Sequence, residues 1–158
     1  MLAERRRNGQ DVFDEWWEGS YRLVDVPAPE HGELIAELAG QLNGLVEMAG
    51  LHVAMLLNIG RDGWDARVAD IGVYRPDTPR TSPAFLTTAV LVVEILSPGE
   101  TAGEKLAFYA AWAVEEYLEV DLCGRSVRLL VRDGDRWEPA ETSPALGFSL
   151  GDLVIDWP

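Results

Sequence analysis

The chain has 158 residues, of which 47% are hydrophobic and 25% charged, the composition of one ordinary globular domain. Its net charge of −14 argues against tight, non-specific DNA binding by the bare protein, because phosphate binding calls for a basic surface. One cysteine and two histidines exclude an intrachain disulfide and a zinc site built from cysteines or from three histidines. No apolar run reaches the ~20 residues of a membrane span, so we expect a cytoplasmic protein without a membrane partner.

The N-terminal region is predicted to be a flexible arm followed by a hairpin. The first ten residues carry three arginines and one glutamate, and we expect them to form a mobile arm, 1–10, ahead of a single domain, 11–158. Two short apolar segments lie on either side of Glu18 and Gly19. This pattern predicts an N-terminal β-hairpin.

A helix and a second hairpin follow. Apolar residues recur every three or four positions from His31 to Ala49, and Gly50 comes next, which predicts one amphipathic helix ended by glycine. Two apolar segments joined by a turn at 61–63 predict a hairpin. Residues 76–88 hold three prolines and are predicted not to continue a sheet.

The C-terminal half supplies the centre of the sheet. Residues 89–96 are apolar except for Glu94, as is typical of a strand buried on both faces. Thr101 and Glu104 have the spacing of a capping box and predict a helix over 105–116. Two more strands and a tail that packs on the sheet edge complete the order: 117–122, 126–132 and 147–158. The economical arrangement is an α/β fold with a central mixed sheet flanked by helices.

Two acidic residues on consecutive predicted strands are the first candidates for chemistry. Glu94 lies within an apolar strand, where a lone carboxylate is paired, protonated or bound to a cation because its burial costs several kcal/mol. Asp70 lies on the face opposite Ala69 and Ile71, and Gly72 is expected to leave open space beside it. Together they could present oxygen ligands to one hard divalent cation. A structural salt bridge for Glu94 and a solvent-facing Asp70 are the alternatives.

Lys105 is the third candidate. We expect it in the first turn of its helix, where the helix dipole disfavours a cation, a short loop after the strand that carries Glu94. Its ammonium could point back to the carboxylates and orient or deprotonate a water, or stabilise charge on a phosphate. Tyr109 shares that helix face. A solvated helix lysine is the alternative.

These residues occur in a pattern that resembles the Uma-type restriction endonuclease family, a branch of the PD-(D/E)xK nuclease superfamily. The matching positions are Asp70, Val93 to Pro98, Glu104-Lys105 with Tyr109-Ala110, and Val114 to Asp121. Pro27 to His31 resembles the proline-rich lead into the family's first helix. The sequence departs from the superfamily at Ala69, where proline usually precedes the aspartate. It also departs at Leu96, which occupies the usual lysine position, so the lysine would come from the helix.

The resemblance implies a restriction-endonuclease-like core and a metal-dependent hydrolase. In such a site Asp70, Glu94 and the backbone carbonyl of Ile95 bind Mg²⁺ or Mn²⁺, and Lys105 assists hydrolysis of DNA or another phosphodiester.

Glu30 and His31, at the mouth of the first helix, are additional candidates, together with Tyr109. A homodimer is plausible because cutting both strands of a duplex calls for two sites. The alternative, favoured by the net charge, is a catalytically silent nuclease-fold module that acts through protein contacts. The same charge favours an enzyme whose nucleic-acid binding comes from a separate protein partner.

Overall fold

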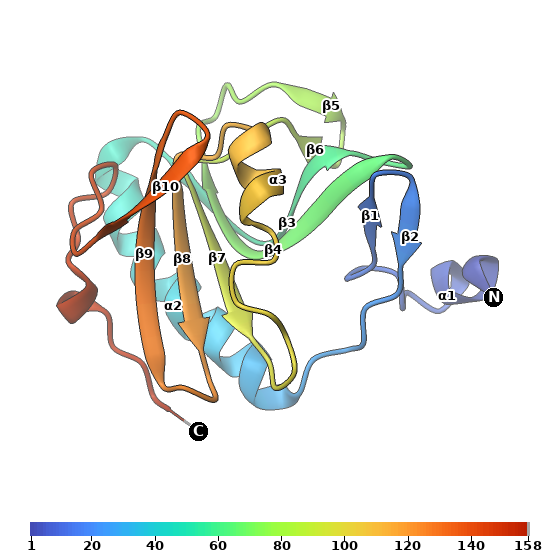
Figure 1. The fold of residues 1–158 in the computed structure, drawn as a ribbon, viewed down its shortest axis with the longest axis horizontal. Helices are drawn as coiled ribbons and strands as arrows, with labels where there is room; N and C mark the ends of the chain where they lie inside the picture. The colour runs from blue at the N-terminus through green and yellow to red at the C-terminus, as the bar shows by residue number, and fades with distance from the viewer. Residues whose placement is uncertain (158) are drawn as a thin grey trace.

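A ten-stranded mixed sheet forms the centre of the structure, a computed structural model that describes residues 1–157 (Figure 1). The elements in chain order are α1 (Leu2–Arg7), β1 (Glu15–Trp17), β2 (Ser20–Arg22), α2 (Pro29–Ala49), β3 (His52–Arg61), β4 (Asp65–Tyr74), β5 (Arg80–Ser82), β6 (Phe85–Leu86), β7 (Leu91–Leu96), α3 (Leu106–Ala111), β8 (Glu116–Asp121), β9 (Ser126–Asp133), β10 (Arg136–Ala140) and the 3₁₀ turn η1 (Leu150–Asp152). The predicted α/β fold with a central mixed sheet and an N-terminal β1–β2 hairpin is confirmed.

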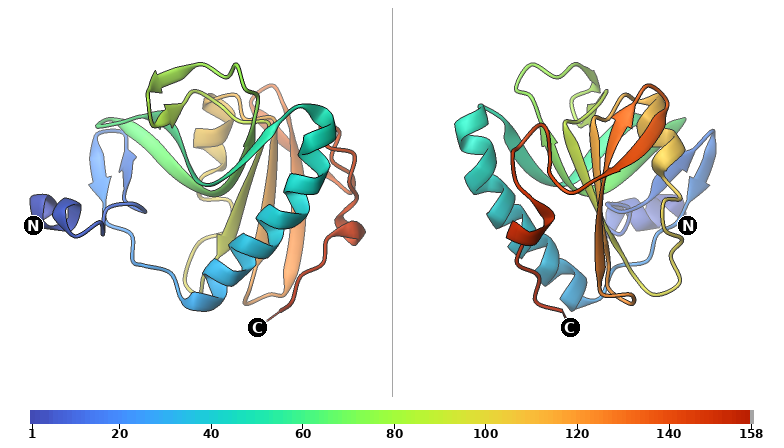
Figure 2. Two further views of the ribbon diagram at one scale, coloured as in Figure 1. Left: turned by 180° about the vertical axis from the view of Figure 1, so that it is seen from behind. Right: turned by 60° about the vertical axis from the view of Figure 1, so that its left-hand side comes forward.

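The strand order places the two candidate carboxylate strands side by side. The sheet runs β10-β9-β8-β7-β4-β3-β6-β5, and β1 attaches to β4 beside this path. β4 and β7 are antiparallel, whereas β7 and β8 are parallel and are connected through α3. α2 covers one face of the sheet and α3 lies on the other (Figure 2). Among residues 1–157 no helix is long and apolar enough to cross a membrane.

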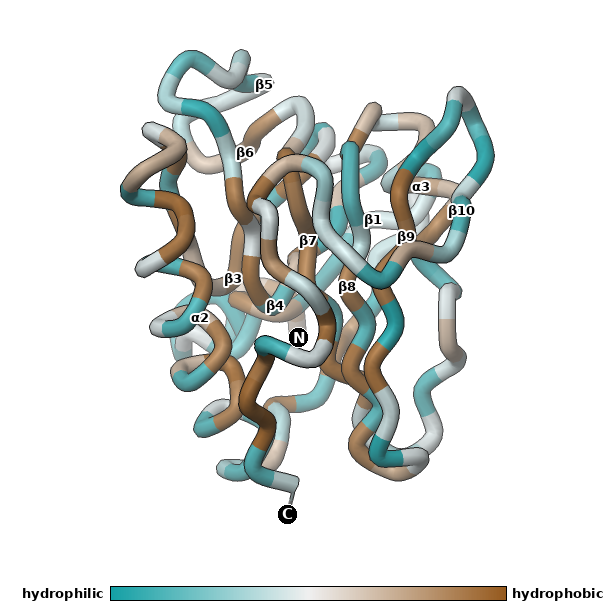
Figure 3. The backbone as a smooth tube through the Cα atoms, turned by 90° about the vertical axis from the view of Figure 1, so that its left-hand side faces the viewer, coloured by the Kyte–Doolittle hydropathy of each residue, from teal (hydrophilic) through white to brown (hydrophobic). Residues whose placement is uncertain are grey.

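The main core lies between α2 and the sheet. Apolar and polar residues alternate along α2 (Figure 3), and its apolar side packs Leu34, Leu38 and Leu42 against the strands. The helix ends as predicted, with Gly50 in the left-handed region at φ 67° and the Leu51 amide bonded to the Val46 carbonyl. This is the Schellman arrangement that glycine favours.

The space beside Gly72 is filled rather than open, which corrects the prediction made from the sequence. A Cβ built on Gly72 would lie 2.1 Å from Leu57 Cδ2 and 2.9 Å from Leu57 Cβ.

We therefore expect Gly72→Ala to lower the free energy of unfolding by about 1–3 kcal/mol through overpacking, measured by urea denaturation. Gly44→Ala, in open space on α2, is the matched control and should raise it by about 0.5–1 kcal/mol. Equal effects of the two changes would contradict the packing of Leu57 on Gly72.

The helix after β7 is shorter than predicted. α3 covers only Leu106–Ala111, and Lys105 lies at its N-cap, so the capping box at Thr101 does not form. The chain turns through residues 101–104 instead, and Gly103 has a φ of 71°. At the other end Ala113 adopts φ 56°, and the Val114 amide bonds to the Tyr109 carbonyl. This Schellman turn ends α3 at Ala111, five residues before the predicted helix end.

Three peripheral segments also differ from the predictions. Residues 76–88 do continue the sheet, because β5 and β6 add to its edge beside β3. β10 is a strand that the sequence pattern did not predict. The C-terminal tail contacts β9 through η1, in part as predicted, and then lies beside α2, where the Val154 amide and carbonyl both bond to Gln41. The predicted arm, 1–10, contains α1, and its mobility stays a prediction.

Candidate active site

The register of β4 and β7 brings the two predicted carboxylates face to face. Ile71 pairs with Val93 and Gly72 with Val92, and continuing this antiparallel ladder by one residue sets Asp70 opposite Glu94. Residues directly opposite on adjacent strands have Cβ atoms about 4.5–5.5 Å apart. The Ile95 amide donates a hydrogen bond of 2.7 Å to Asp70 Oδ2, which fixes this carboxylate at the end of the ladder.

Glu94 is buried within a ring of polar partners. Its side chain accepts hydrogen bonds from the Tyr109 hydroxyl and from the Lys105 ammonium, whose Nζ lies 3.1 Å from Oε2. Burial raises the pKa of Glu94 to about 8, against the lowering effect of Lys105. A carboxyl group with this pKa holds a proton near neutral pH and releases it when a cation binds.

Lys105 points inward, although it stands at the start of its helix. Its Nζ lies 2.8 Å from Glu15 Oε1 and donates a hydrogen bond of 3.2 Å to the Val68 carbonyl, in addition to the bonds to Glu94. Burial alone would lower the pKa of Lys105, but the charges of Glu94 and Glu15 outweigh it and raise this pKa above the ordinary value. The side chain is therefore a fixed cation, and it is not suited to removing a proton from water.

His31 holds the other carboxylate. It lies in the first turn of α2 and is only 6% exposed. Its Nε2 is 3.1 Å from Asp70 Oδ1, and its Nδ1 is 3.1 Å from Ser97 Oγ. Burial lowers the pKa of His31, but the hydrogen bond to Asp70 and the charge of Asp70 raise it by more. Glu30, the other candidate in this turn, is exposed and does not line the cavity.

These side chains open onto one cavity of about 490 Å³. Asp70, Glu94, Lys105 and His31 all line it, and so does Glu15 from the N-terminal hairpin. The segment 22–28 forms another part of the wall. The structure thus gathers four of the predicted candidates around a space large enough for a phosphodiester group, with Tyr109 directly behind Glu94.

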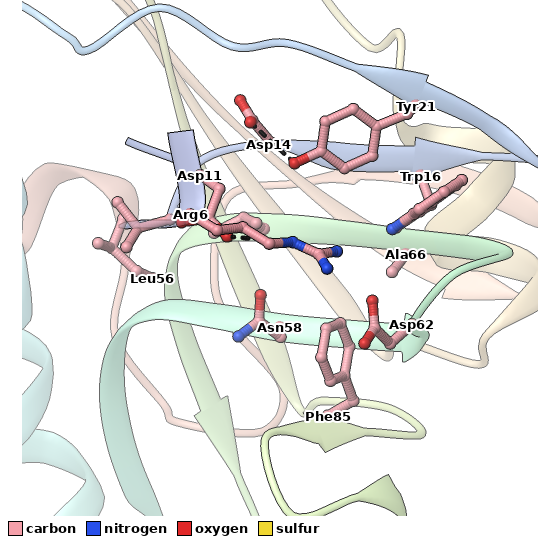
Figure 4. A pocket seen from close by; sticks show the side chains of 12 residues that line it. Arg6, Asp11, Asp14, Trp16, Tyr21, Leu56, Asn58, Asp62, Ala66 and Phe85 are labelled. Atoms are coloured by element: carbon pink, nitrogen blue, oxygen red, sulfur yellow. Dashed lines mark hydrogen bonds and ion pairs between the residues drawn. The ribbon is translucent and has the colours of Figure 1, made fainter. Parts of the chain in front are cut away.

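A second cavity, of about 480 Å³, lies on the other side of the hairpin (Figure 4). Trp16, Tyr21 and Phe85 contribute aromatic rings to it, and the Arg6 guanidinium points into it. Asp14 is held by Tyr21, whose hydroxyl donates a hydrogen bond of 2.9 Å to Oδ2. None of the predicted catalytic candidates lines this cavity.

Comparison with known proteins identifies the family. A family model described as "Uma2: Putative restriction endonuclease" matches residues 4–156. The chain belongs to the Uma2 family. A crystal structure of "a putative nuclease belonging to DUF820" from Anabaena variabilis superposes with a TM-score of 0.69, 19% sequence identity and coverage of 88% of both chains. No curated protein sequence matches significantly. The structural match thus shows that the two chains share a fold, and the family model shows the Uma2 family.

Glu15 is the residue of this Uma2-family site that the sequence reasoning missed. It comes from β1, far from the other candidates in the chain, and it is only 5% exposed. The local sequence Asp14-Glu15-Trp16-Trp17 resembles an ordinary half-exposed strand. A clearer signal was available for its partner, because Lys105 is the only lysine in a chain with twelve arginines. The one lysine of this otherwise arginine-containing chain lies beside the buried carboxylates of Glu15 and Glu94.

The donor set of this site fits a hard divalent cation of the magnesium type. Within residues 1–157 no three His, Cys, Asp or Glu side chains form a ready-made ligand cluster. Asp70 and Glu94 nevertheless offer two carboxylates from adjacent strands. Ile95, the residue whose carbonyl is the third predicted ligand, follows Glu94 in β7, and its amide bonds to Asp70. One or two carboxylates with several retained waters is the usual way in which Mg²⁺ is bound.

Proposed function

We propose that this chain is a magnesium-dependent endonuclease that hydrolyses DNA or another phosphodiester. The observation that carries the proposal is the convergence of Asp70, Glu94 and Lys105 on one cavity. Asp70, Glu94 and the Ile95 carbonyl would hold Mg²⁺ or Mn²⁺, which polarises a phosphate and lowers the pKa of a bound water. The family model and the structural neighbour support nuclease chemistry.

Three side chains of this chain have separate roles at the site. Lys105, as a fixed cation, donates hydrogen bonds to a phosphate oxygen and offsets the negative charge that grows in the transition state. Tyr109 orients the Glu94 carboxylate, and His31 orients Asp70 through its Nε2. Because Lys105 stays protonated, the proton of the attacking water passes to solvent or to the substrate rather than to this amine.

Plasmid cleavage tests the proposal directly. Supercoiled DNA incubated with the protein and MgCl₂ or MnCl₂ should be nicked or linearised, and EDTA should stop the reaction. The metal concentration should be about 5–10 mM, roughly the saturating range for a weak Mg²⁺ site. Asp70→Asn, which keeps the shape of the side chain, is the matched inactive control. Intact plasmid with both metals, or equal cleavage by Asp70→Asn, would refute the assignment.

Metal binding should depend on pH in a defined direction. Since the pKa of Glu94 is raised to about 8 in the metal-free protein, a bound cation must displace its proton at lower pH. We expect the affinity for Mn²⁺ to increase by about tenfold per pH unit from pH 6 to 8 and to level off above. Calorimetric titrations in two buffers of different protonation enthalpy would measure both the affinity and the released proton. A pH-independent affinity would contradict the buried, protonated Glu94.

A second candidate function is a silent nuclease-fold module that acts through protein contacts. The observation in its favour is charge: Asp25, Glu100 and Glu104 also line the cavity, and the whole chain carries −14. These charges repel a phosphate backbone unless a partner or metal ions offset them. Absence of Mn²⁺ binding at millimolar concentration would favour this module. A homodimer, a separate protein that supplies nucleic-acid binding and a cytoplasmic location remain proposals with either function.

A further inference from the structure

Glu15 connects the N-terminal hairpin to the site described above. Its Oε1 lies 2.8 Å from Lys105 Nζ and accepts a hydrogen bond of 3.0 Å from the Val68 amide. Its Oε2 accepts a hydrogen bond of 2.9 Å from the Trp17 indole nitrogen. Both carboxylate oxygens are therefore held by neighbours, so Glu15 is a fixed charge rather than a mobile side chain.

We propose that Glu15 is the positioning residue for Lys105: it keeps the ammonium directed at the cavity when Glu94 turns to a metal ion. This inference deepens the proposed function and rests on it for its catalytic consequence. Glu94 now has two duties, because the same carboxylate faces Lys105 and is a proposed metal ligand. Once Glu94 binds a cation, its charge no longer serves the ammonium alone, and Glu15 is the remaining carboxylate in contact with Nζ.

Stability alone does not explain this arrangement. Taking two charges out of water costs about as much as their attraction returns, so buried ion pairs give little net stability compared with apolar residues of similar volume. Six carboxylates line the cavity, those of Glu15, Asp25, Asp70, Glu94, Glu100 and Glu104, whereas its basic side chains are Lys105, Arg22 and His31. The surplus of negative charge is unfavourable in the empty site and becomes favourable when a divalent cation enters.

Neighbouring side chains hold the carboxylate of Glu15 in one position. The guanidinium carbons of Arg22 and Arg67 lie 3.5 Å and 3.7 Å from the centre of the Trp17 ring. This stacking holds the indole whose nitrogen bonds to Glu15. Arg67 is itself only 4% exposed and bonds to the Trp16 carbonyl. The hairpin thus carries a supported carboxylate into the cavity, and it is a structural part of the active centre.

Enzyme kinetics test the catalytic consequence. Glu15→Gln should lower kcat by about 10- to 100-fold, as loss of a supporting partner at a metal site commonly does, with KM and Mn²⁺ affinity changed by only about threefold or less. Glu15→Asp retains the charge and should recover part of kcat. Glu18→Gln, an exposed change in the same hairpin, should have wild-type kinetics. A wild-type kcat for Glu15→Gln would overturn the proposal.

A second measurement does not depend on nuclease activity. Lys105 is the only lysine, so the rate at which an amine-directed acylating reagent modifies its side chain is readily followed by peptide mass spectrometry. Glu15→Gln should increase this rate several-fold at pH 8, because the side chain of Lys105 loses the contact that holds it in place, and Glu18→Gln should not. An unchanged rate in a folded Glu15→Gln protein would refute the contact. If the wild-type protein shows no cleavage and the labelling rate of Glu15→Gln still rises, the proposed function fails and the positioning of Lys105 by Glu15 stands.

Discussion

Glu94→Gln is expected to remove metal-dependent cleavage and, at the same time, to make the metal-free protein more stable. Losing a proposed metal ligand together with its charge should reduce kcat by at least about 100- to 1,000-fold. The gain in stability follows from the raised pKa of Glu94, about 8 against an ordinary value of 4.5. A carboxyl whose pKa is higher in the folded state loses stabilising effect as pH rises from the unfolded value to the folded one.

The stability comparison has a specific pH window. Wild type and Glu94→Gln should have similar unfolding free energies below about pH 4.5, and the variant should become increasingly more stable up to about pH 8. Above that pH the difference should stay constant. Urea denaturation in EDTA at about pH 4.5, 6.5 and 8.5 would measure this difference in unfolding free energy. Addition of about 10 mM Mn²⁺, roughly the level that fills a weak carboxylate site, should reduce the difference because it stabilises the wild type alone. A variant that cleaves normally, or is less stable at pH 8.5, would contradict this account.

Lys105→Met should have the opposite effect on stability and a similar effect on cleavage. Removing the cation leaves Glu15 and Glu94 as neighbouring buried carboxylates, and breaking a buried pair in this way costs about 3–5 kcal/mol. The two carboxylates then raise each other's pKa, so the loss of stability should grow as pH rises. Cleavage should fall by at least about 100-fold because the transition-state charge is no longer offset.

The matched control for this change is Lys105→Arg. It keeps the charge and should retain most of the stability, yet the guanidinium is larger and planar and does not reproduce the three bonds of the ammonium. We therefore expect cleavage to stay low. Thermal and urea denaturation, run beside plasmid cleavage, separate the two effects. If Lys105→Met were as stable as wild type at high pH, the close contact between Lys105 and the two carboxylates would be wrong.

Most of the sheet could be predicted because its strands carry strong local patterns. Three patterns each predicted the correct element: the apolar residues on both sides of Glu94, the alternation around Asp70 and the helical repeat that ends at Gly50. The failures lie where backbone geometry overrides composition. The helix after Lys105 was predicted to be longer because alanine, the residue at position 113, is a good helix former. The neighbouring sequence does not show that Ala113 adopts a left-handed conformation.

The candidate site was partly predictable for the same reason. Asp70 and Glu94 were identifiable because a charge in an apolar strand is costly, and the pairing of β4 with β7 brings them together. Glu15 was not identifiable, because its burial is created by packing of the hairpin against β4 and not by its own neighbours in the chain. Glu30 and His31 had equal standing in the sequence. Only the direction in which α2 enters the structure separates them.

The attachment of the N-terminal hairpin has a further consequence for motion. β1 joins β4 through a single residue pair, Trp16 with Ala66, and the rest of its hold comes from side chains such as Arg67 and Glu15. A unit attached by so short a ladder opens at a lower free energy than the strands beneath it. Amide hydrogen exchange should therefore be faster in β1 and β2 than in β4 and β7. Because β1 carries Glu15, such an opening would separate this carboxylate from the Lys105 ammonium and, under the proposed function, would admit a DNA strand from the side of the hairpin.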